Sequence, residues 1–380
     1  MKKVLFATTA LAGLAIGGVA SAQGIALFGD ARLGLGYNIN NDGEVVVEQN
    51  DDGSLDTPDD LRAVSRVRFG VNMTGETDSG ITFGATIRAD NAIGGQGGTN
   101  GQTAGSVFVS GSWGTLTYGD TNGADEQWVG DVPGDYSLTG LGELDETIFI
   151  SNGGNFGTGE GGSSFADNPT ARPTVRYDFD IMGFGLSVSS NRDLTDVGVG
   201  TGYSADFGGG SWTAGIGYYK FDSFDAVTGV ETFTVTDVNG NEIEVVGPEI
   251  TGTFPDGETW SAGLSAEYEA FGFGLTYIKL NSDTADLGEF DADNILVGAS
   301  FGWDAWAFGV VYGNILSAEG ALESLDGASS WEVSAQYDLG GGATINGGVR
   351  QTYDTLEIGD DDDDLGDAAT VADFGIKMAF

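Results

Sequence analysis

The sequence contains no cysteine and no histidine. Without cysteine the chain can form no disulfide and offers no thiolate as a nucleophile or metal ligand. Without histidine it lacks the commonest general base, the serine–histidine triads and the usual zinc sites. We therefore predict that the protein is not an enzyme.

Proline and basic residues are also scarce. The 380 residues include 6 prolines, and 14 lysines and arginines stand against 58 acids, which gives a net charge of −44. A nucleic acid would be repelled by such a chain, so no nucleic-acid partner is expected. This charge would favour disorder if aromatic residues were few, but 22 Phe, 12 Tyr and 7 Trp predict a folded protein.

The start of the chain predicts a secretory signal peptide. Lys2 and Lys3 precede an uncharged apolar run that ends in Ala-Ser-Ala, which fits a signal-peptide cleavage site. A transmembrane helix is the alternative, but the run is short and has no stop-transfer flank. We expect a cleaved leader at 1–22 and a mature chain at 23–380, with 12 basic residues against 58 acids and a net charge of −46.

The rest of the chain consists of short segments in which apolar and polar residues alternate, as in half-buried β-strands. No convincing helix interrupts them. Sixteen such segments are expected, at 25–37, 62–74, 81–90, 105–112, 114–120, 172–179, 184–190, 200–207, 211–221, 259–268, 271–280, 293–301, 305–314, 329–337, 343–353 and 370–380.

Short and long connections alternate along the whole chain. Tight turns such as SWG and FGGGS alternate with longer, mostly acidic segments, of which 121–171 is the longest. This order predicts an up-and-down barrel with turns at one rim and loops at the other. An even number of strands brings the first and last together, and they close the sheet, as hydrocarbon requires. Outer-membrane barrels have this plan; a soluble sandwich or solenoid is the alternative.

The parity of charged residues separates these two interpretations. In SRVRFGVNM, Arg66 and Arg68 share one face of the strand, whereas Val67 and Phe69 share the other. A wall of sixteen strands would enclose a lumen too wide for side chains to fill, so the apolar face is expected to meet lipid and the polar face water. Four residues break the pattern: Phe108 and Leu296 on the polar face, and Lys220 and Lys279 on the apolar face.

Aromatic residues gather at or beside the short turns. Rings concentrated at one rim are what a girdle at the membrane interface needs. The residues are Trp113, Phe179, Phe184, Phe207, Trp212, Tyr268, Phe271, Phe301, Trp303, Trp306 and Phe380.

Five segments together resemble the general diffusion porins of alphaproteobacteria, the purple-bacterial type. They are GDARLGLGYN (29–38), SRVRFGVNMTGETDSGITFGATI (65–87), GSVFVSGSWGTLTYGD (105–120), YDLGGGATINGGV (337–349) and VADFGIKMAF (371–380). The resemblance implies an all-β, 16-stranded antiparallel transmembrane barrel with short periplasmic turns and long extracellular loops, assembled as a homotrimer. It also implies an assembly signal in the last strand, formed by Phe374, Ile376, Met378 and Phe380.

The resemblance further implies that the third long loop folds into the lumen as a constriction. In such porins acids on this loop face basic residues on the wall. By position the wall residues are Arg32, Arg66, Arg68 and Arg88, and the loop acids are Asp120, Asp125, Glu126, Asp131 and Asp135. The arginines could instead be salt-bridged wall, and the acids could serve solubility at the cell surface.

The sequence thus predicts a passive, water-filled channel for ions and small hydrophilic solutes in the outer membrane of a Gram-negative cell. The acidic loops predict a modest preference for cations. A substrate-specific channel, for sugars or other small solutes, is the alternative. The expected partners are outer-membrane lipid, lipopolysaccharide, the barrel assembly machinery and two further copies of the chain. No cofactor is required, although the resemblance makes calcium plausible at loop carboxylates.

Overall fold

The computed structural model describes most of the expected mature chain. The described residues are 24–39, 48–49, 55–56, 61–89, 104–142, 148–152, 174–236, 242–254, 256–284, 288–320, 323, 326–353 and 368–380. The predicted signal peptide and the acidic run at 360–367 lie outside them.

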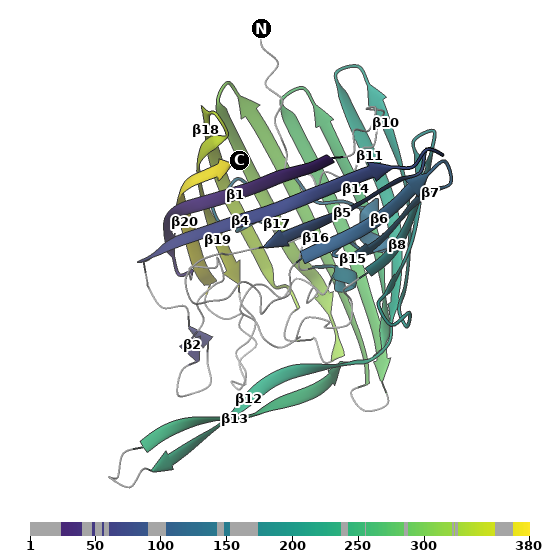
Figure 1. Cartoon of the computed structure of the whole chain (residues 1–380). Helices are drawn as coiled ribbons and strands as arrows, with labels where there is room; N and C mark the ends of the chain where they lie inside the picture. The colour runs from purple at the N-terminus through teal and green to yellow at the C-terminus, as the bar shows by residue number, and fades with distance from the viewer. Residues whose placement is uncertain are drawn as a thin grey trace.

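Sixteen antiparallel strands form one closed barrel, in which each strand pairs with its neighbours in sequence order (Figure 1). All sixteen expected strands are present, with ends that differ from the expected ones by at most five residues. The strands are β1 (Gly24–Tyr37), β4 (Leu61–Glu76), β5 (Thr82–Ala89), β6 (Ala104–Gly111), β7 (Gly114–Gly119), β8 (Thr174–Ile181), β9 (Phe184–Asn191), β10 (Val197–Phe207), β11 (Gly210–Phe221), β14 (Gly257–Tyr268), β15 (Phe271–Thr284), β16 (Gly288–Trp303), β17 (Trp306–Ala318), β18 (Ser329–Gly340), β19 (Ala343–Tyr353) and β20 (Ala368–Ala379).

The first and last strands close the barrel. Strand β1 pairs with β4 on one side and with β20 on the other, where Arg32 lies opposite Lys377. The short turns lie together at the rim drawn uppermost in Figure 1. Several depend on left-handed backbone, as at Met182 and Gly183 (φ 55° and 82°). The predicted fold class is therefore confirmed.

A few elements lie outside the barrel wall. A short helix, α1 (Ala124–Gln127), and a 3-10 turn, η2 (Ile150–Asn152), belong to the third long loop. The loop expected at 222–258 contains two paired strands, β12 (Phe224–Thr236) and β13 (Glu242–Phe254), and a second small sheet joins β2 (Glu48–Gln49) and β3 (Leu55–Asp56). None of the helices among the described residues is long and apolar enough to cross a membrane.

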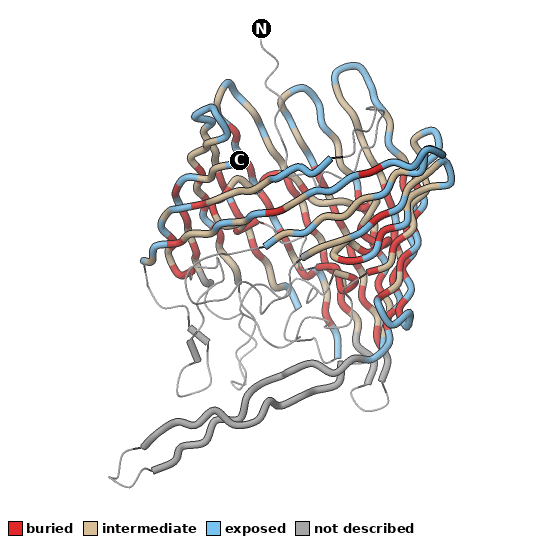
Figure 2. Tube along the Cα trace, viewed as in Figure 1, coloured by how far each residue is buried: buried red, intermediate tan, exposed pale blue. Residues whose placement is uncertain are grey.

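The two faces of the wall differ as the alternation predicts. On β17 the outward side chains Phe308, Val310 and Tyr312 are 41–43% exposed, whereas Ala307 and Val311 on the lumen side are 2% and 0% exposed. Figure 2 shows the same alternation of buried and more exposed residues along many strands. Apolar side chains thus cover the outside of a closed sheet, which suits contact with lipid.

Paired rings form an outward belt near the short turns. The ring pairs that contact each other across the strands are Trp113–Tyr177, Phe184–Tyr203, Tyr203–Trp212, Phe207–Tyr268, Phe271–Phe301 and Trp306–Tyr337. This arrangement matches the aromatic girdle expected from the sequence.

The four exceptions to the alternation have local explanations. Leu296 points into the lumen because it packs in an apolar cluster with residues of the third loop. Phe108 lies on the lumen face beside Gly84, where the missing side chain leaves room for its ring. Lys279 points outward and pairs with Asp293 at 3.5 Å. Lys220 lies opposite Glu258 on the same outward face.

Candidate functional site

The third long loop lies inside the barrel and follows its wall. Its described residues, 120–142 and 148–152, begin at β7 and contact successive strands in order. Ala124 binds β9, Gly130 binds β15, Tyr136 binds β18 and β19, and Thr139 binds β1. The expected insertion of this loop into the lumen is therefore seen in the structure.

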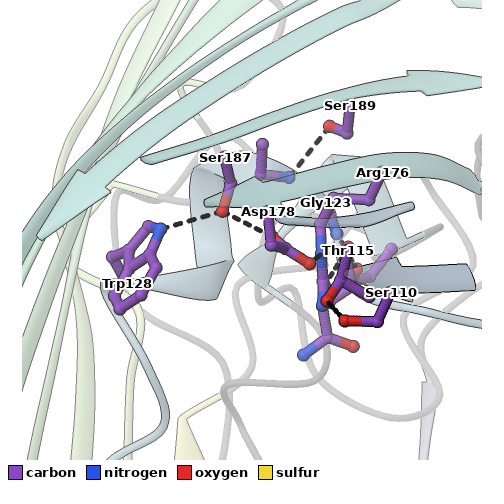
Figure 3. Close-up of polar contacts among 11 residues, drawn as sticks. Ser110, Thr115, Gly123, Trp128, Arg176, Asp178, Ser187 and Ser189 are labelled. Atoms are coloured by element: carbon purple, nitrogen blue, oxygen red, sulfur yellow. Dashed lines mark hydrogen bonds and ion pairs between the residues drawn. The ribbon is translucent and has the colours of Figure 1, made fainter. Parts of the chain in front are cut away.

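The start of the loop is held by a hydrogen-bond network on β8 and β9 (Figure 3). The indole Nε1 of Trp128 donates to Ser187 Oγ at 2.8 Å, and Ser187 donates to Asp178 at 2.6 Å. Arg176 binds the other oxygen of Asp178 at 2.9 Å and donates to the Asn122 carbonyl at 2.7 Å. A buried cation thereby fixes the point where the loop turns inward.

Side-chain donors and acceptors on the wall then hold the loop backbone. Ser261 donates to the carbonyl of Asp125 at 2.7 Å, and Thr276 to that of Gly130 at 3.2 Å. Ser334 accepts from the Tyr136 amide at 2.8 Å and donates to Gly134 at 3.1 Å. These bonds satisfy backbone groups that the loop would otherwise bury unpaired.

The loop segment at 138–141 is held by Asp373 and two arginines. Asp373 accepts from the amides of Leu138 and Thr139 and from the Thr139 hydroxyl, at 2.6–3.0 Å. Arg32 donates to the Thr139 carbonyl at 2.7 Å, and Arg350 donates to Leu141 at 3.3 Å. Arg32 and Arg350 are both 3% exposed.

The described part of the loop thus covers the wall from β8 round to β1, which is twelve consecutive strands of the sixteen in the closed ring. On β4 it reaches Val64, which shares an apolar cluster with Leu138 and Leu141. We call the rest of the lumen face, formed by β5, β6, β7 and β4 from Arg66 to Glu76, the open wall.

Three of the four predicted wall arginines lie on the open wall. Arg66 and Arg68 are on β4 and Arg88 is on β5. In register, Arg32 lies opposite Arg66 and Asp30 lies opposite Arg68. Asp30 also approaches Arg66, at 3.6 Å. The structure therefore brings the predicted bases together on adjacent strands, and it assigns Arg32 a contact with the loop itself.

The predicted loop acids occupy two kinds of environment. Asp125 and Glu126 in α1 are 1% and 2% exposed and lie between the loop and the wall. Glu126 accepts hydrogen bonds from Asn122 and Asn152. Asp120, Asp131 and Asp135 are half-buried.

The buried acids lie across the ring from the arginines. The Asp125 carbonyl binds Ser261 on β14 and touches β11 at Gly217. Strands β11 and β14 are each seven or eight places from β1 and β4 in the sixteen-strand ring. Opposite charges thus stand on opposite sides of the barrel, as the predicted transverse field requires. Their role in selectivity remains a prediction.

Burial makes the Asp125 carboxyl a weaker acid than usual. Loss of solvent raises the pKa of its carboxyl from 3.8 to about 6, although a hydrogen bond from Ser151 opposes the shift. The docked loop therefore holds this proton more tightly than a released loop would. Docking should weaken as the pH rises from about 4 to about 6, by at most about 3 kcal/mol, and stay constant above that range.

We expect hydrogen exchange of a backbone amide just after α1 to show this pH dependence. After correction for intrinsic rates, the amide of Gly130, which donates to the Glu126 carbonyl, should be less protected at pH 7.5 than at pH 5. Asp125→Asn cannot ionise and should remove the difference. If the variant kept the full pH dependence, another group would be responsible.

Several residues that hold the loop were not predicted from the sequence. Strand parity places Arg176 and Arg350 on the lumen face but gives them no further role, and nothing in the sequence singles out Trp128 or Ser334. Their polar or bulky side chains on the lumen parity were the only available signal, because their partners lie far away in sequence, up to 209 residues for Arg350 and Leu141.

Metal binding finds little support in the described part of the chain. No group of three or more Asp, Glu, His or Cys residues there is placed to hold a metal ion. The acidic run at 360–367 lies outside the described residues. Calcium at loop carboxylates therefore remains a prediction.

A closed barrel with an apolar exterior and a lumen narrowed by its own loop defines a transmembrane channel protein. The family model for Gram-negative porins matches residues 7–355, and the chain belongs to that family. A porin from Rhodobacter capsulatus is 28% identical over 372 residues, which are 94% of this chain and 100% of that protein.

Solved porin structures have the same fold. A porin refined at 1.8 Å resolution matches 94% of this chain and 100% of its own, with a TM-score of 0.58 and 22% identity. A triple mutant of the Rhodopseudomonas blastica porin matches the same shares, with a TM-score of 0.52 and 19% identity. The resemblance to alphaproteobacterial porins is confirmed, and the family consists of outer-membrane channels, not enzymes.

Proposed function

We propose that this protein is a general diffusion porin, which lets ions and small hydrophilic solutes cross the outer membrane passively. The observation that carries the proposal is the position of the third loop. Its described residues line most of the wall and do not cover the open wall, which carries Arg66, Arg68 and Arg88. Solutes would pass between loop and open wall. Size would be limited by the loop, and charge selectivity would come from both surfaces.

A modest preference for cations is part of the proposal. The chain carries a net charge of −44, and its long connections are rich in acids. Acidic loops at the channel mouth concentrate cations there, and this effect weakens as salt shortens the Debye length. The arginines of the open wall oppose it locally, so anions are not excluded.

A homotrimer is also proposed. Strands β7 and β9, whose ends both lie among the described residues, have 6 and 8 residues. A strand needs roughly 9–11 residues to span a bilayer. We infer that two further copies of the chain, and not lipid alone, cover this side of the wall.

Lipopolysaccharide and outer-membrane lipid are the proposed surroundings. On the outward face near the long loops, Asp293 accepts from Tyr277 at 2.8 Å and pairs with Lys279, while Glu258 accepts from Tyr218 at 2.8 Å. Charged and amphipathic side chains on an outward face suit the polar boundary of a membrane. Export through a cleaved signal peptide, and insertion by the barrel assembly machinery through Phe374, Ile376, Met378 and Phe380, complete the proposal.

Planar-bilayer recording tests the channel function. Purified protein in a potassium chloride gradient should conduct in steps of three and give a reversal potential that favours potassium. Competitive block by one solute would instead indicate a substrate-specific channel. Silence from folded protein would contradict the channel function itself.

The open wall should control the charge preference. Replacing both Arg66 and Arg68 with alanine removes two positive charges from the lumen, so the preference for potassium should rise severalfold. The matched control, Arg192→Ala with Lys220→Ala, removes two exposed positive charges elsewhere and should change the reversal potential little. An equal change in both variants would place Arg66 and Arg68 away from the constriction.

A further inference from the structure

Six lumen-facing glycines lie directly beneath the third loop. They come from five strands on one side of the barrel, β10, β11, β14, β16 and β17. We call them the glycine seat: Gly200, Gly215, Gly217, Gly263, Gly298 and Gly309.

At each of the six positions a side chain would collide with the loop backbone. A Cβ built on Gly309 would lie 1.7 Å from the Gly134 carbonyl oxygen, and one on Gly298 would lie 2.1 Å from that of Pro133. The nearest atom is a loop carbonyl oxygen in every case. The other four oxygens belong to Ala124, Trp128, Asp125 and Val129, at 1.8–2.3 Å.

The backbone conformation does not explain these glycines. None of the six has a positive φ angle, so any residue could adopt their extended strand geometry. Glycine in a strand interior weakens the sheet and often marks a close approach of another backbone. Space for the loop is therefore the property that these positions provide.

Four of the six glycines also pair with each other across the sheet. Gly200 lies opposite Gly217, and Gly215 lies opposite Gly263. The gaps thus join into a shallow track along which the loop lies against the wall.

We propose that the glycine seat determines the width of the pore, and so the size limit for solutes. This inference rests on the proposed diffusion function. The wall is a closed sheet that cannot retreat easily, and the loop is held along its path by Ser261, Thr276 and Ser334. A methyl group added to the seat therefore displaces the loop toward the lumen. The size limit for solutes thus depends on wall glycines that the loop covers and that no solute contacts.

A pair of alanine substitutions tests the proposal. Gly298→Ala with Gly309→Ala should lower the single-channel conductance by roughly a quarter to a half, because conductance follows the open cross-section. Entry of sugars into proteoliposomes should slow more for larger sugars than for small ones.

The matched control adds two methyl groups on the outward face. In Gly105→Ala with Gly347→Ala, the nearest atom to each added methyl group would be a wall carbonyl oxygen at 3.0 Å, and neither would meet the loop. We expect this pair to conduct nearly as the wild type does. Folding of each variant is checked by its resistance to unfolding in unheated detergent gels, and Gly263→Ala alone replaces the pair if the pair does not fold.

The outcomes distinguish the inference about the glycine seat from the proposed diffusion function. A fall in conductance confined to the seat variants supports it. Unchanged or raised conductance in folded seat variants, or an equal fall in the control pair, overturns it while leaving the diffusion function intact. A wild-type protein that does not conduct would overturn the proposed function and this inference together.

Discussion

Replacing Asp373 with alanine should narrow the channel. This buried carboxylate accepts three hydrogen bonds from Leu138 and Thr139 of the loop and one from the Gly348 amide on β19. Without it these donors lose their acceptor while still buried, which costs about 3–5 kcal/mol if the loop stays in place. The loop segment near Thr139 is therefore expected to leave the wall.

The expected readout is a single-channel conductance about half to two thirds that of the wild type, with noisier open currents, because the released segment moves off the wall into the lumen. Asp338→Ala is the matched control. It removes the same charge from β18, where Asp338 accepts from Gly340 at the short turns, away from the loop. Wild-type conductance in folded Asp373→Ala would show that this anchor does not hold the constriction.

Val310→Arg should greatly impair insertion into the membrane. Val310 is the fifth residue of β17, points outward and is 43% exposed. An arginine on the lipid face of a barrel costs about 2–4 kcal/mol near the bilayer midplane. The inserted fraction in lipid vesicles and the free energy of unfolding should both fall accordingly.

Thr86→Arg provides the matched control for this substitution. Thr86 is the fifth residue of β5 and faces the lumen, where its hydroxyl donates to Asn72 at 2.8 Å. The same side chain should be tolerated there because water solvates it, and it should reduce the preference for cations. Equal destabilisation by the two arginines would contradict the assignment of lipid and water to the two faces.

The wall could be predicted from the sequence because its rules are local. A strand alternates with a period of two, and lipid on one side and water on the other impose that period on composition. For this reason the parity of Arg66 and Arg68 correctly predicted that both residues lie on the lumen face. The alternation of short and long connections gave the topology.

The seating of the loop could not be predicted in the same way. It depends on contacts between residues far apart in sequence, such as Leu138 and Asp373, which are 235 residues apart. Sequence alone places Asp125 on the loop, but it cannot tell whether the carboxylate faces water or the wall. The structure buries it.

Glycines at lumen-facing strand positions are a sequence signal for where the loop lies. Gly200, Gly217 and Gly263 occur where the alternation calls for polar side chains, and Leu296 interrupts that alternation for the same reason. In each case the lumen face meets the loop and not water. An unexplained departure from the alternation therefore marked the surface on which the loop lies.

Thiol labelling tests the arrangement of loop and open wall most directly, because the chain has no cysteine of its own. Thr86→Cys lies on the open wall, whereas Val311→Cys lies on the lumen face beneath the loop at a residue that is 0% exposed. A charged methanethiosulfonate added during bilayer recording should reduce the current through Thr86→Cys and leave Val311→Cys unchanged. Rapid block of Val311→Cys, with no effect on Thr86→Cys, would contradict the position of the loop and of the pore.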